Sequence, residues 1–323
     1  MKELLTFGRY TKKRFGTQVY KVPISISGFT CPNIDGTTAV GGCTFCENDS
    51  FSPNLGKAQA LDHSKKFYLN LESKSNPNLE LQLKQLELQF DALSNQMKKK
   101  FGAKKFIVYF QSFTNTYAPL ETLKALYEKA LSFPNVVGLS IGTRSDSITQ
   151  ETLDYLVTLN EKNEIWIEYG IQSVFDETLQ RINRGHDSKN VETWIKKSRE
   201  AGLKVCAHLI YGLPGEDASM MQKTFEKTIE WGVDSIKFHP LYVVKKTALA
   251  NEFASGKFTP IDEESYIDML VWSLKRLPKD IVIQRITAGI SDESLISPAW
   301  CKEDKNSQMK KIHTALKEVE LRY

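Results

Sequence analysis

The sequence has no run of apolar residues that approaches the ~20 needed to span a membrane, and Met1–Leu5 open no apolar stretch long enough for a secretory signal peptide. Cysteine is scarce: the 323 residues contain 5, an odd number that leaves at least one thiol unpaired in any disulfide scheme. No Ser/His/Asp arrangement typical of a hydrolytic triad is visible. These absences argue against membrane, disulfide-rich and triad-hydrolase classes, and they predict a cytoplasmic protein whose thiols stay reduced.

Charge of one sign is not in strong excess, because 43 basic residues against 39 acidic ones give a net charge of +4. The total therefore does not indicate a nucleic-acid binder. Two basic clusters are more suggestive: Lys12–Arg14, and Lys98–Lys100 together with Lys104 and Lys105. A groove between them would suit a phosphate backbone, and solvated helix ends explain them equally well.

Three of the cysteines, Cys31, Cys43 and Cys46, lie in one glycine-broken loop. A structural zinc site or a closed iron–sulfur cluster needs four protein ligands, and a second Cys-x-x-Cys pair is lacking. Three thiolates on a [4Fe–4S] cluster would leave one iron open for an exogenous ligand. A zinc site completed by a histidine, with His63 as the nearest candidate, is the alternative. The other two cysteines stand alone and are interpreted as buried or incidental thiols.

Apolar, β-branched runs alternate with stretches of helical periodicity along the chain. The predicted strands are Val22–Ser27, Phe106–Gln111, Val136–Ile141, Glu164–Gly170, Lys204–Tyr211 and Ser235–Leu241. The predicted helices are the segment of Leu79 to Met97, Pro119–Phe133, Thr149–Leu159, Ser188–Ala201 and Ala218–Trp231. Gly202 and Gly232 fall where a helix C-terminus needs a positive φ.

Strands that alternate with helices pair in parallel through right-handed crossovers. We therefore expect an α/β fold, an open (β/α)6 partial TIM-type barrel of parallel strands. Residues 1–245 would form the barrel core with an N-terminal extension. Residues 246–323 would form a C-terminal extension that packs on the barrel, with a strand at Ile281–Ile286 and a final helix from about Asn306 to Leu321.

The cysteine loop, with Phe45 directly before Cys46, resembles the cluster loop of radical S-adenosylmethionine (SAM) enzymes. The eleven residues between Cys31 and Cys43 are similar to the longer loops of the branch that holds the elongator catalytic subunit and the YhcC/YtqA-type proteins. Further motifs of that branch follow the predicted strands. They are Gly142-Thr143-Arg144-Ser145-Asp146, Glu168-Tyr169-Gly170-Ile171-Gln172-Ser173 with Arg184-Gly185-His186, and His208-Leu209-Ile210-Tyr211-Gly212-Leu213-Pro214-Gly215.

The resemblance implies a [4Fe–4S] cluster on the three loop cysteines, SAM on the open iron and the ring of Phe45 beside the adenine. Arg184 would hold the SAM carboxylate, since a guanidinium matches a carboxylate as a fork. Glu168, a charged residue on an otherwise apolar strand, needs a partner, and a ribose diol would supply one. The full set of predicted SAM contacts is Phe45, Gln111, Ser112, Thr114, Arg144, Glu168, Gln172, Arg184 and His208.

The same resemblance implies an enzyme that reductively cleaves SAM to methionine and a 5′-deoxyadenosyl radical, which abstracts hydrogen from a C–H bond. The implied electron donor is a flavodoxin or ferredoxin. The branch implies a tRNA substrate and wobble-uridine modification. Because no acetyltransferase domain is visible in the sequence, we expect remodelling of an existing carboxymethylaminomethyl-type substituent. A radical SAM enzyme acting on a small molecule in cofactor metabolism and a non-catalytic metal-binding module are the alternatives.

Overall fold

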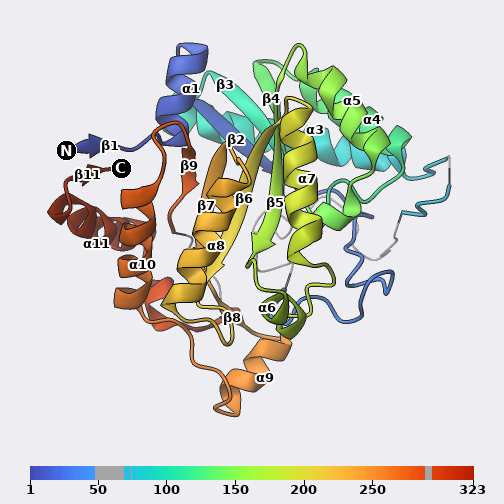
Figure 1. Ribbon diagram of the computed structural model, residues 1–323. Coiled ribbons are helices and arrows are strands. Elements are labelled where there is room, and N and C mark those ends of the chain that lie inside the picture. Colours follow the sequence, from blue (N-terminus) through green and yellow to red (C-terminus); the bar gives the residue numbers. More distant parts are fainter. Residues whose placement is uncertain (48–68, 74, 288–292) are drawn as a thin grey trace.

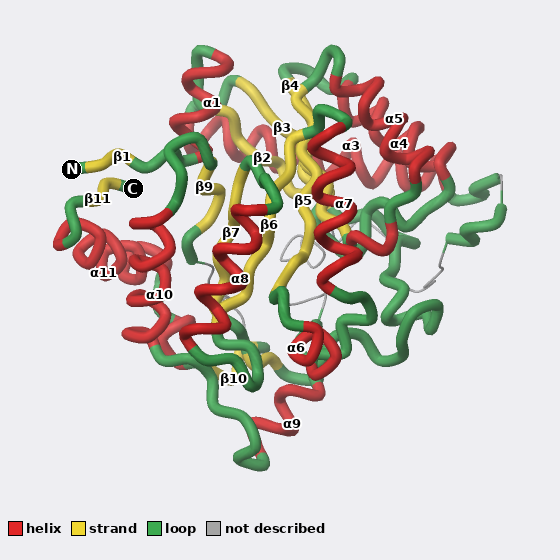
Figure 2. The backbone as a smooth tube through the Cα atoms, viewed as in Figure 1, coloured by secondary structure: helices red, strands yellow, loops and turns green. Residues whose placement is uncertain are grey.

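The computed structural model describes residues 1–47, 69–73, 75–287 and 293–323, and its centre is a curved parallel sheet (Figures 1 and 2). Among these residues the sheet has seven strands in the order β2-β3-β4-β5-β6-β7-β9. The strands are β2 (Val19–Ile24), β3 (Lys105–Phe110), β4 (Val136–Thr143), β5 (Glu164–Gln172), β6 (Lys204–Tyr211), β7 (Ser235–Pro240) and β9 (Val282–Arg285).

Helices lie around the outside of this sheet, so that its concave face forms the interior of a half-barrel (Figure 1). The helices are α1 (Phe7–Phe15), α3 (Leu79–Phe101), α4 (Leu120–Leu131), α5 (Gln150–Asn160), α6 (Asp176–Arg181), α7 (Ser188–Glu200), α8 (Ala218–Glu230), α9 (Ala248–Ala254), α10 (Glu263–Arg276) and α11 (Lys305–Glu318). None of them combines the length and the apolar content that crossing a membrane requires, within the part of the chain described.

The open parallel barrel predicted from the sequence is confirmed, with one strand more than the six expected. The additional strand is β9, which pairs in parallel with β7 and places Val282 opposite Ser235. The C-terminal residues thus contribute to the sheet as well as to the helices α10 and α11 on its outside. Gly202 and Gly232 have φ values of 82° and 86°, as predicted for residues that end helices.

Strand β2 ends earlier than predicted, and the residues that follow it are fixed by helix α3. Gln89 Oε1 and Gln85 Oε1 accept from the backbone N–H groups of Ser25 and Ser27 at 3.0 and 2.9 Å. Gln82 Nε2 donates to the Ser27 carbonyl at 2.6 Å. All three glutamines are buried. Because their amides supply the hydrogen bonds that a neighbouring strand would otherwise make, the segment leading to Cys31 is held without being part of the sheet.

The amino ends of the strands are closed by the N-terminal helix. Tyr10 and Phe7 of α1 pack against Trp166 of β5, with ring centroids 5.6 and 6.3 Å apart. The two chain ends meet beside this helix, where β1 (Lys2–Glu3) pairs in parallel with β11 (Leu321–Arg322) (Figure 1). The barrel interior is therefore plugged at its amino end.

The two basic clusters lie at this same amino-end face. Lys12–Arg14 end helix α1, and Lys98–Lys100 end helix α3 directly before β3. The two helix ends are neighbours, because Lys105 Nζ donates to the Phe15 carbonyl at 3.2 Å. The clusters thus share one surface, at the opposite ends of the strands from the cysteine loop.

A matched pair of Gly→Ala substitutions tests the packing of the sheet. A Cβ on Gly138 of β4 would lie 1.9 Å from the backbone oxygen of Glu164, whereas a Cβ on Gly8 of α1 meets only the end of Gln18 at 3.5 Å. We expect Gly138→Ala to destabilise the protein by at least ~1–3 kcal/mol, because a backbone carbonyl has to move. Gly8→Ala should stabilise it by ~0.4–1 kcal/mol. Thermal unfolding under anaerobic conditions measures both, and equal midpoints would contradict the strand packing.

Candidate active site at the carboxyl ends of the strands

The cysteine loop follows β2 and is folded by its own turns. Its backbone makes close hydrogen bonds, among them Ile34 N–H to the Cys31 carbonyl at 2.7 Å and Cys46 N–H to the Cys43 carbonyl at 2.9 Å. The buried Asn33 anchors the loop to the segment after α6, since its Nδ2 donates to the carbonyls of residues 183 and 184 at 2.6 and 2.9 Å. The three cysteines are thereby turned toward the carboxyl ends of the strands.

Two buried arginines point at the cysteine sulfurs. Arg184 Nη1 lies 3.7 Å from Cys43 Sγ, and Arg144 Nη1 lies 3.8 Å from Cys31 Sγ. Burial, together with the neighbouring Cys43 and Cys31, raises the pKa of the Cys46 thiol. Crowded thiols of this kind become thiolates when a metal supplies positive charge. The arginines add positive charge beside the sulfurs, so the donor set fits a metal group.

The number of thiols fits a cluster with one open iron better than a structural zinc ion, which takes four protein ligands. His63, the histidine considered for zinc, lies outside the described residues.

Beside the cysteines, the end of β5 forms a cradle with unsatisfied polar atoms. Arg184 Nη2 donates to the Gly170 carbonyl at 2.8 Å, while its buried Nε and the buried Oε1 of Gln172 have no hydrogen-bond partner. A Cβ on Gly170 would lie 2.8 Å from both Arg184 Nη2 and Gln172 Nε2, so a larger residue there would displace the ends of these two side chains. Gln172 itself has a φ of 67°. Orphaned buried groups of this kind indicate a ligand that completes them.

Phe45 and the predicted contacts after β3 lie beside the cysteine loop and the segment that leads to it. Phe45 is buried in an apolar group with Cys43, Leu213 and Leu241. The loop after β3 is tied to the cysteine loop, because Thr114 N–H donates to the Thr30 carbonyl at 3.2 Å. Gln111 N–H donates to the Ile24 carbonyl at 3.2 Å, and Ser112 is buried between these two contacts. This loop could therefore bind an ammonium group, such as the amino group of SAM, through its carbonyl oxygens and side chains.

Arg144 is fixed by a neighbour on its own loop. Its Nε and Nη2 donate to Asp146 Oδ1 and Oδ2 at 2.8 and 2.6 Å, a bidentate pair. The Gly142–Asp146 motif therefore sets the direction of the guanidinium that points at Cys31. A charge held rigidly at that sulfur would tune the electronics of a bound cluster.

Glu168 lies deeper in the barrel than expected, and its side chain is fully buried. Its carboxylate accepts from Lys21, Ser140 and Lys237, and from His208 Nε2 at 2.8 Å. The two oxygens expected to meet a ribose diol thus already have four protein donors, and this geometry lends the ribose contact no support. Sequence reasoning missed both lysines. The sequence did contain a signal for them: on β2 and on β7 a lysine stands at a position whose side chain, by the alternation along a strand, points into the barrel.

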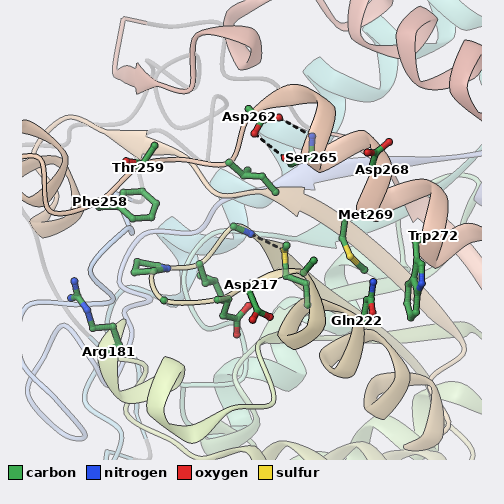
Figure 3. A pocket seen from close by; sticks show the side chains of 18 of the residues that line it. Arg181, Asp217, Gln222, Phe258, Thr259, Asp262, Ser265, Asp268, Met269 and Trp272 are labelled. Carbon is green, nitrogen blue, oxygen red and sulfur yellow. Dashed lines mark hydrogen bonds between the residues drawn. The ribbon is translucent and has the colours of Figure 1, made fainter.

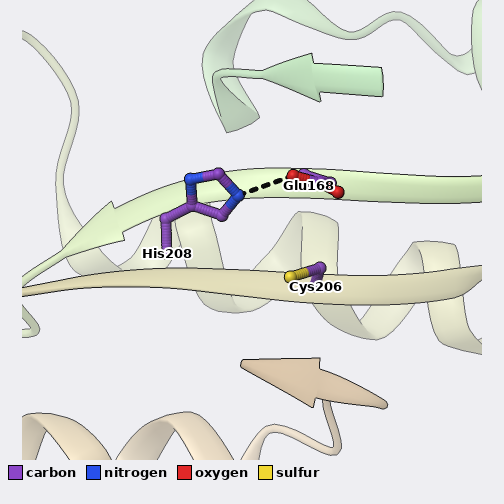
Figure 4. Close-up of side chains that lie close together, drawn as sticks. All are labelled: Glu168, Cys206 and His208. Carbon is purple, nitrogen blue, oxygen red and sulfur yellow. Dashed lines mark hydrogen bonds and ion pairs between the residues drawn. The ribbon is translucent and has the colours of Figure 1, made fainter. Parts of the chain in front are cut away.

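Glu168, Cys206 and His208 lie close enough together to be considered as metal ligands, with their ligand atoms within 4.8 Å of one another (Figure 4). The charges around Glu168 argue against a metal ion there. Burial alone would raise the pKa of Glu168, but the charges of Lys21 and Lys237 hold it well below the usual range. Burial and the charge of Lys237 lower the pKa of His208 to about 4, so this imidazole is neutral at pH 7. Lys21 and Lys237 already occupy the carboxylate, and their positive charge opposes a cation there, although burial lowers the pKa of Lys237 to about 7. The group is consequently a structural network.

A cavity of about 870 Å³ lies between the loop at residues 212–217 and the helices α8 and α10 (Figure 3). The glycine motif after β6 forms one wall, where a Cβ on Gly212 would lie 2.7 Å from Ile261. The side chains of Asp217, Asp262 and Asp268 make the lining acidic. The loop cysteines and the two buried arginines are not among its lining residues. The cavity is therefore separate from the cysteine site.

Comparisons with known proteins bear on this site. The profile of the Radical SAM superfamily matches residues 36–228, and that of the Radical_SAM C-terminal domain matches residues 233–318. Protein YhcC of Escherichia coli is 34% identical over 297 residues, which cover 92% of this chain and 87% of that protein. The tRNA uridine(34) acetyltransferase of Methanocaldococcus infernus is 29% identical over 157 residues, 48% of this chain and 29% of that protein.

Among solved structures, Elp3 of Methanocaldococcus infernus with its N-terminus deleted has the same fold. It superposes with a TM-score of 0.60 at 19% identity over 94% of this chain, which spans 65% of that chain. The predicted resemblance to YhcC-type proteins and to the elongator core is confirmed. With the three-thiol loop and the open parallel barrel, these matches identify an enzyme that uses a [4Fe–4S] cluster and SAM. The chain belongs to the radical SAM superfamily.

Proposed function

We propose that Cys31, Cys43 and Cys46 hold the [4Fe–4S] cluster and that SAM occupies the cradle formed by Arg184 and Gln172. The proposal depends on one observation: the unpartnered polar atoms of Arg184 and Gln172 lie in the same space as the loop cysteines, joined by the Arg184 contact to Cys43. When bound, the cluster and SAM supply an electron and a carbon radical that abstracts hydrogen from the substrate.

The chain's own residues bind and orient SAM in this proposal. The Arg184 guanidinium receives the carboxylate of SAM, because its Nε needs an acceptor. Gln172 Oε1 needs a donor and receives an amino or hydroxyl group. Phe45, already packed against Cys43, lies beside the adenine. Arg144 keeps a fixed positive charge next to Cys31, and the neutral His208 adds no further charge to the barrel wall.

The substrate we propose is tRNA, at a carboxymethylaminomethyl-type substituent of the wobble uridine that the enzyme remodels. The support is the 157-residue similarity to a protein named tRNA uridine(34) acetyltransferase. A single-stranded anticodon loop can extend its wobble base into a barrel that is open on one side. The basic clusters add nothing to this proposal, because they lie at the amino-end face, away from the cysteines.

Enzymes of this superfamily take their electron from a donor, and a flavodoxin or ferredoxin is the donor we propose. All five cysteines are free thiols in the structure. Free thiols and a reducible cluster suit a compartment that keeps thiols reduced, so we propose that the enzyme works in the cytoplasm.

Replacing any one of Cys31, Cys43 or Cys46 with alanine should abolish the intact cluster and SAM cleavage, because each removes one of three ligands. Cys206→Ala and Cys301→Ala should keep both, since these thiols lie outside the loop. Iron and sulfide analysis after anaerobic reconstitution, with absorbance near ~400 nm, measures the cluster. Full cluster content in Cys43→Ala would overturn the ligand assignment.

Arg184→Ala and Gln172→Ala should keep the cluster and weaken SAM binding by roughly 10- to 100-fold, the effect of losing a charge-assisted hydrogen bond. Arg276→Ala, which removes an exposed arginine of α10, is the matched control and should change neither. Titration of SAM against the reconstituted variants decides the point. Unchanged SAM affinity in both cradle variants would refute the cradle.

A strain that lacks this gene should accumulate tRNA whose wobble uridine keeps its carboxymethylaminomethyl-type substituent, because the enzyme that we propose to remodel this group is missing. Mass spectrometry of tRNA nucleosides, with the complemented strain as control, measures this. An unaltered wobble-uridine profile would rule out tRNA and favour a small-molecule substrate in cofactor metabolism. It would leave the cluster and SAM assignments untouched.

A further inference from the structure

The inner wall of the barrel carries more positive than negative charge at one level. Lys21 and Lys237 lie there on a single carboxylate, Glu168, whose two oxygens are occupied by protein donors, and Arg285 is the register partner of Lys237 on the next strand. Arg285 forms no ion pair with any described residue, and its Nη1 donates only to the imidazole of His239. Among the described residues no carboxylate pairs with this partly buried guanidinium, which leaves it able to receive an anion from outside.

The strand register connects this charge to the proposed SAM cradle. Gly170 pairs with His208, His208 pairs with Lys237, and Lys237 pairs with Arg285, so the four positions form one row across β5, β6, β7 and β9. Arg184 is bonded to the Gly170 carbonyl at the cradle end of the row. Neighbouring strands lie ~4.8 Å apart, so the cradle and Arg285 are separated by roughly 14 Å of wall.

The protonation of the two histidines suits an anion at the Arg285 end. Arginine is always a donor, so His239 Nε2 accepts its hydrogen bond and His239 must carry its proton on Nδ1. Burial and the Arg285 charge hold the pKa of His239 well below the usual range, so the ring is neutral and offers one N–H. Its ring centroid lies 6.5 Å from that of His208. The guanidinium of Arg285 and the Nδ1–H group of His239 are thus two neighbouring hydrogen-bond donors.

We infer that Arg285 and His239 form a subsite for a carboxylate group of the substrate. The inference rests on the proposed radical SAM function and adds to it where the substrate is held. The planar guanidinium matches the two oxygens of a carboxylate, and a phosphodiester, which arginine can also bind bidentately, would bring a bulky nucleic-acid backbone to the barrel wall. The subsite therefore favours substrates whose reacting carbon is a few bonds from a carboxylate.

Binding to the reconstituted holoenzyme tests the subsite, with 5-carboxymethylaminomethyluridine and its methyl ester as probes in calorimetric titrations. The protein should bind the acid ~10- to 100-fold more tightly than the ester, the effect of one charge-assisted pair. Arg285→Gln should remove that preference and Arg285→Lys, which keeps the charge but loses the fork, should reduce it. Arg276→Gln, a substitution of an exposed arginine, should preserve it. Equal affinity for acid and ester in the unsubstituted protein overturns the subsite.

A second probe separates this inference from the proposed function. Iminodiacetate carries the carboxymethylamine group without the uridine. If it binds the holoenzyme and the binding is lost in Arg285→Gln, while the wobble-uridine profile of the deletion strain is unaltered, the subsite holds and the tRNA proposal fails. If the tRNA nucleoside profile changes as proposed but iminodiacetate, acid and ester show no dependence on Arg285, the function holds and the subsite is wrong.

Discussion

One buried carboxylate organises the inside of this barrel. Glu168 joins β5 to Lys21 on β2, Ser140 on β4, His208 on β6 and Lys237 on β7. Ions taken out of water are stable only if they are paired and hydrogen-bonded, and removing one partner typically costs ~3–5 kcal/mol. The network therefore ties strands from both halves of the sheet at one level. Because β2 and β7 lie near opposite edges of the sheet, these bonds hold the curved sheet together across its concave face.

The polar network also separates two regions of the barrel with different chemistry. Below it, Tyr10, Phe7 and Trp166 close the amino end with aromatic packing. Above it, the wall carries the arginines, histidines and thiols that can meet ligands. A radical enzyme has to exclude water and competing reactions from its reacting atoms, and the plugged amino end closes the barrel from that direction. The packed amino end thus supports the site at the carboxyl ends of the strands.

The cysteine loop and β5 are coupled through Arg184. That side chain touches Cys43 Sγ at 3.7 Å and the Gly170 carbonyl at 2.8 Å, and Asn33 of the loop bonds its backbone carbonyl at 2.9 Å. A ligand that contacts Arg184 in the cradle would therefore also affect the position of the cysteine loop. A side chain at position 170 would push the ends of Arg184 and Gln172 out of this arrangement, which gives the Glu-x-Gly-x-Gln motif a steric reason.

The sequence by itself determined the alternation of strands and helices, the parallel sheet, the three-thiol loop and the order of the polar motifs, because periodicity and residue chemistry are local properties. It left out β9 as a barrel strand, the clamp of Gln82, Gln85 and Gln89, and the lysines that surround Glu168. Only the tertiary structure decided these, since each depends on which distant segments become neighbours. A lone lysine on a strand reveals its partner only when the sheet curves and brings β2 and β7 to the same carboxylate.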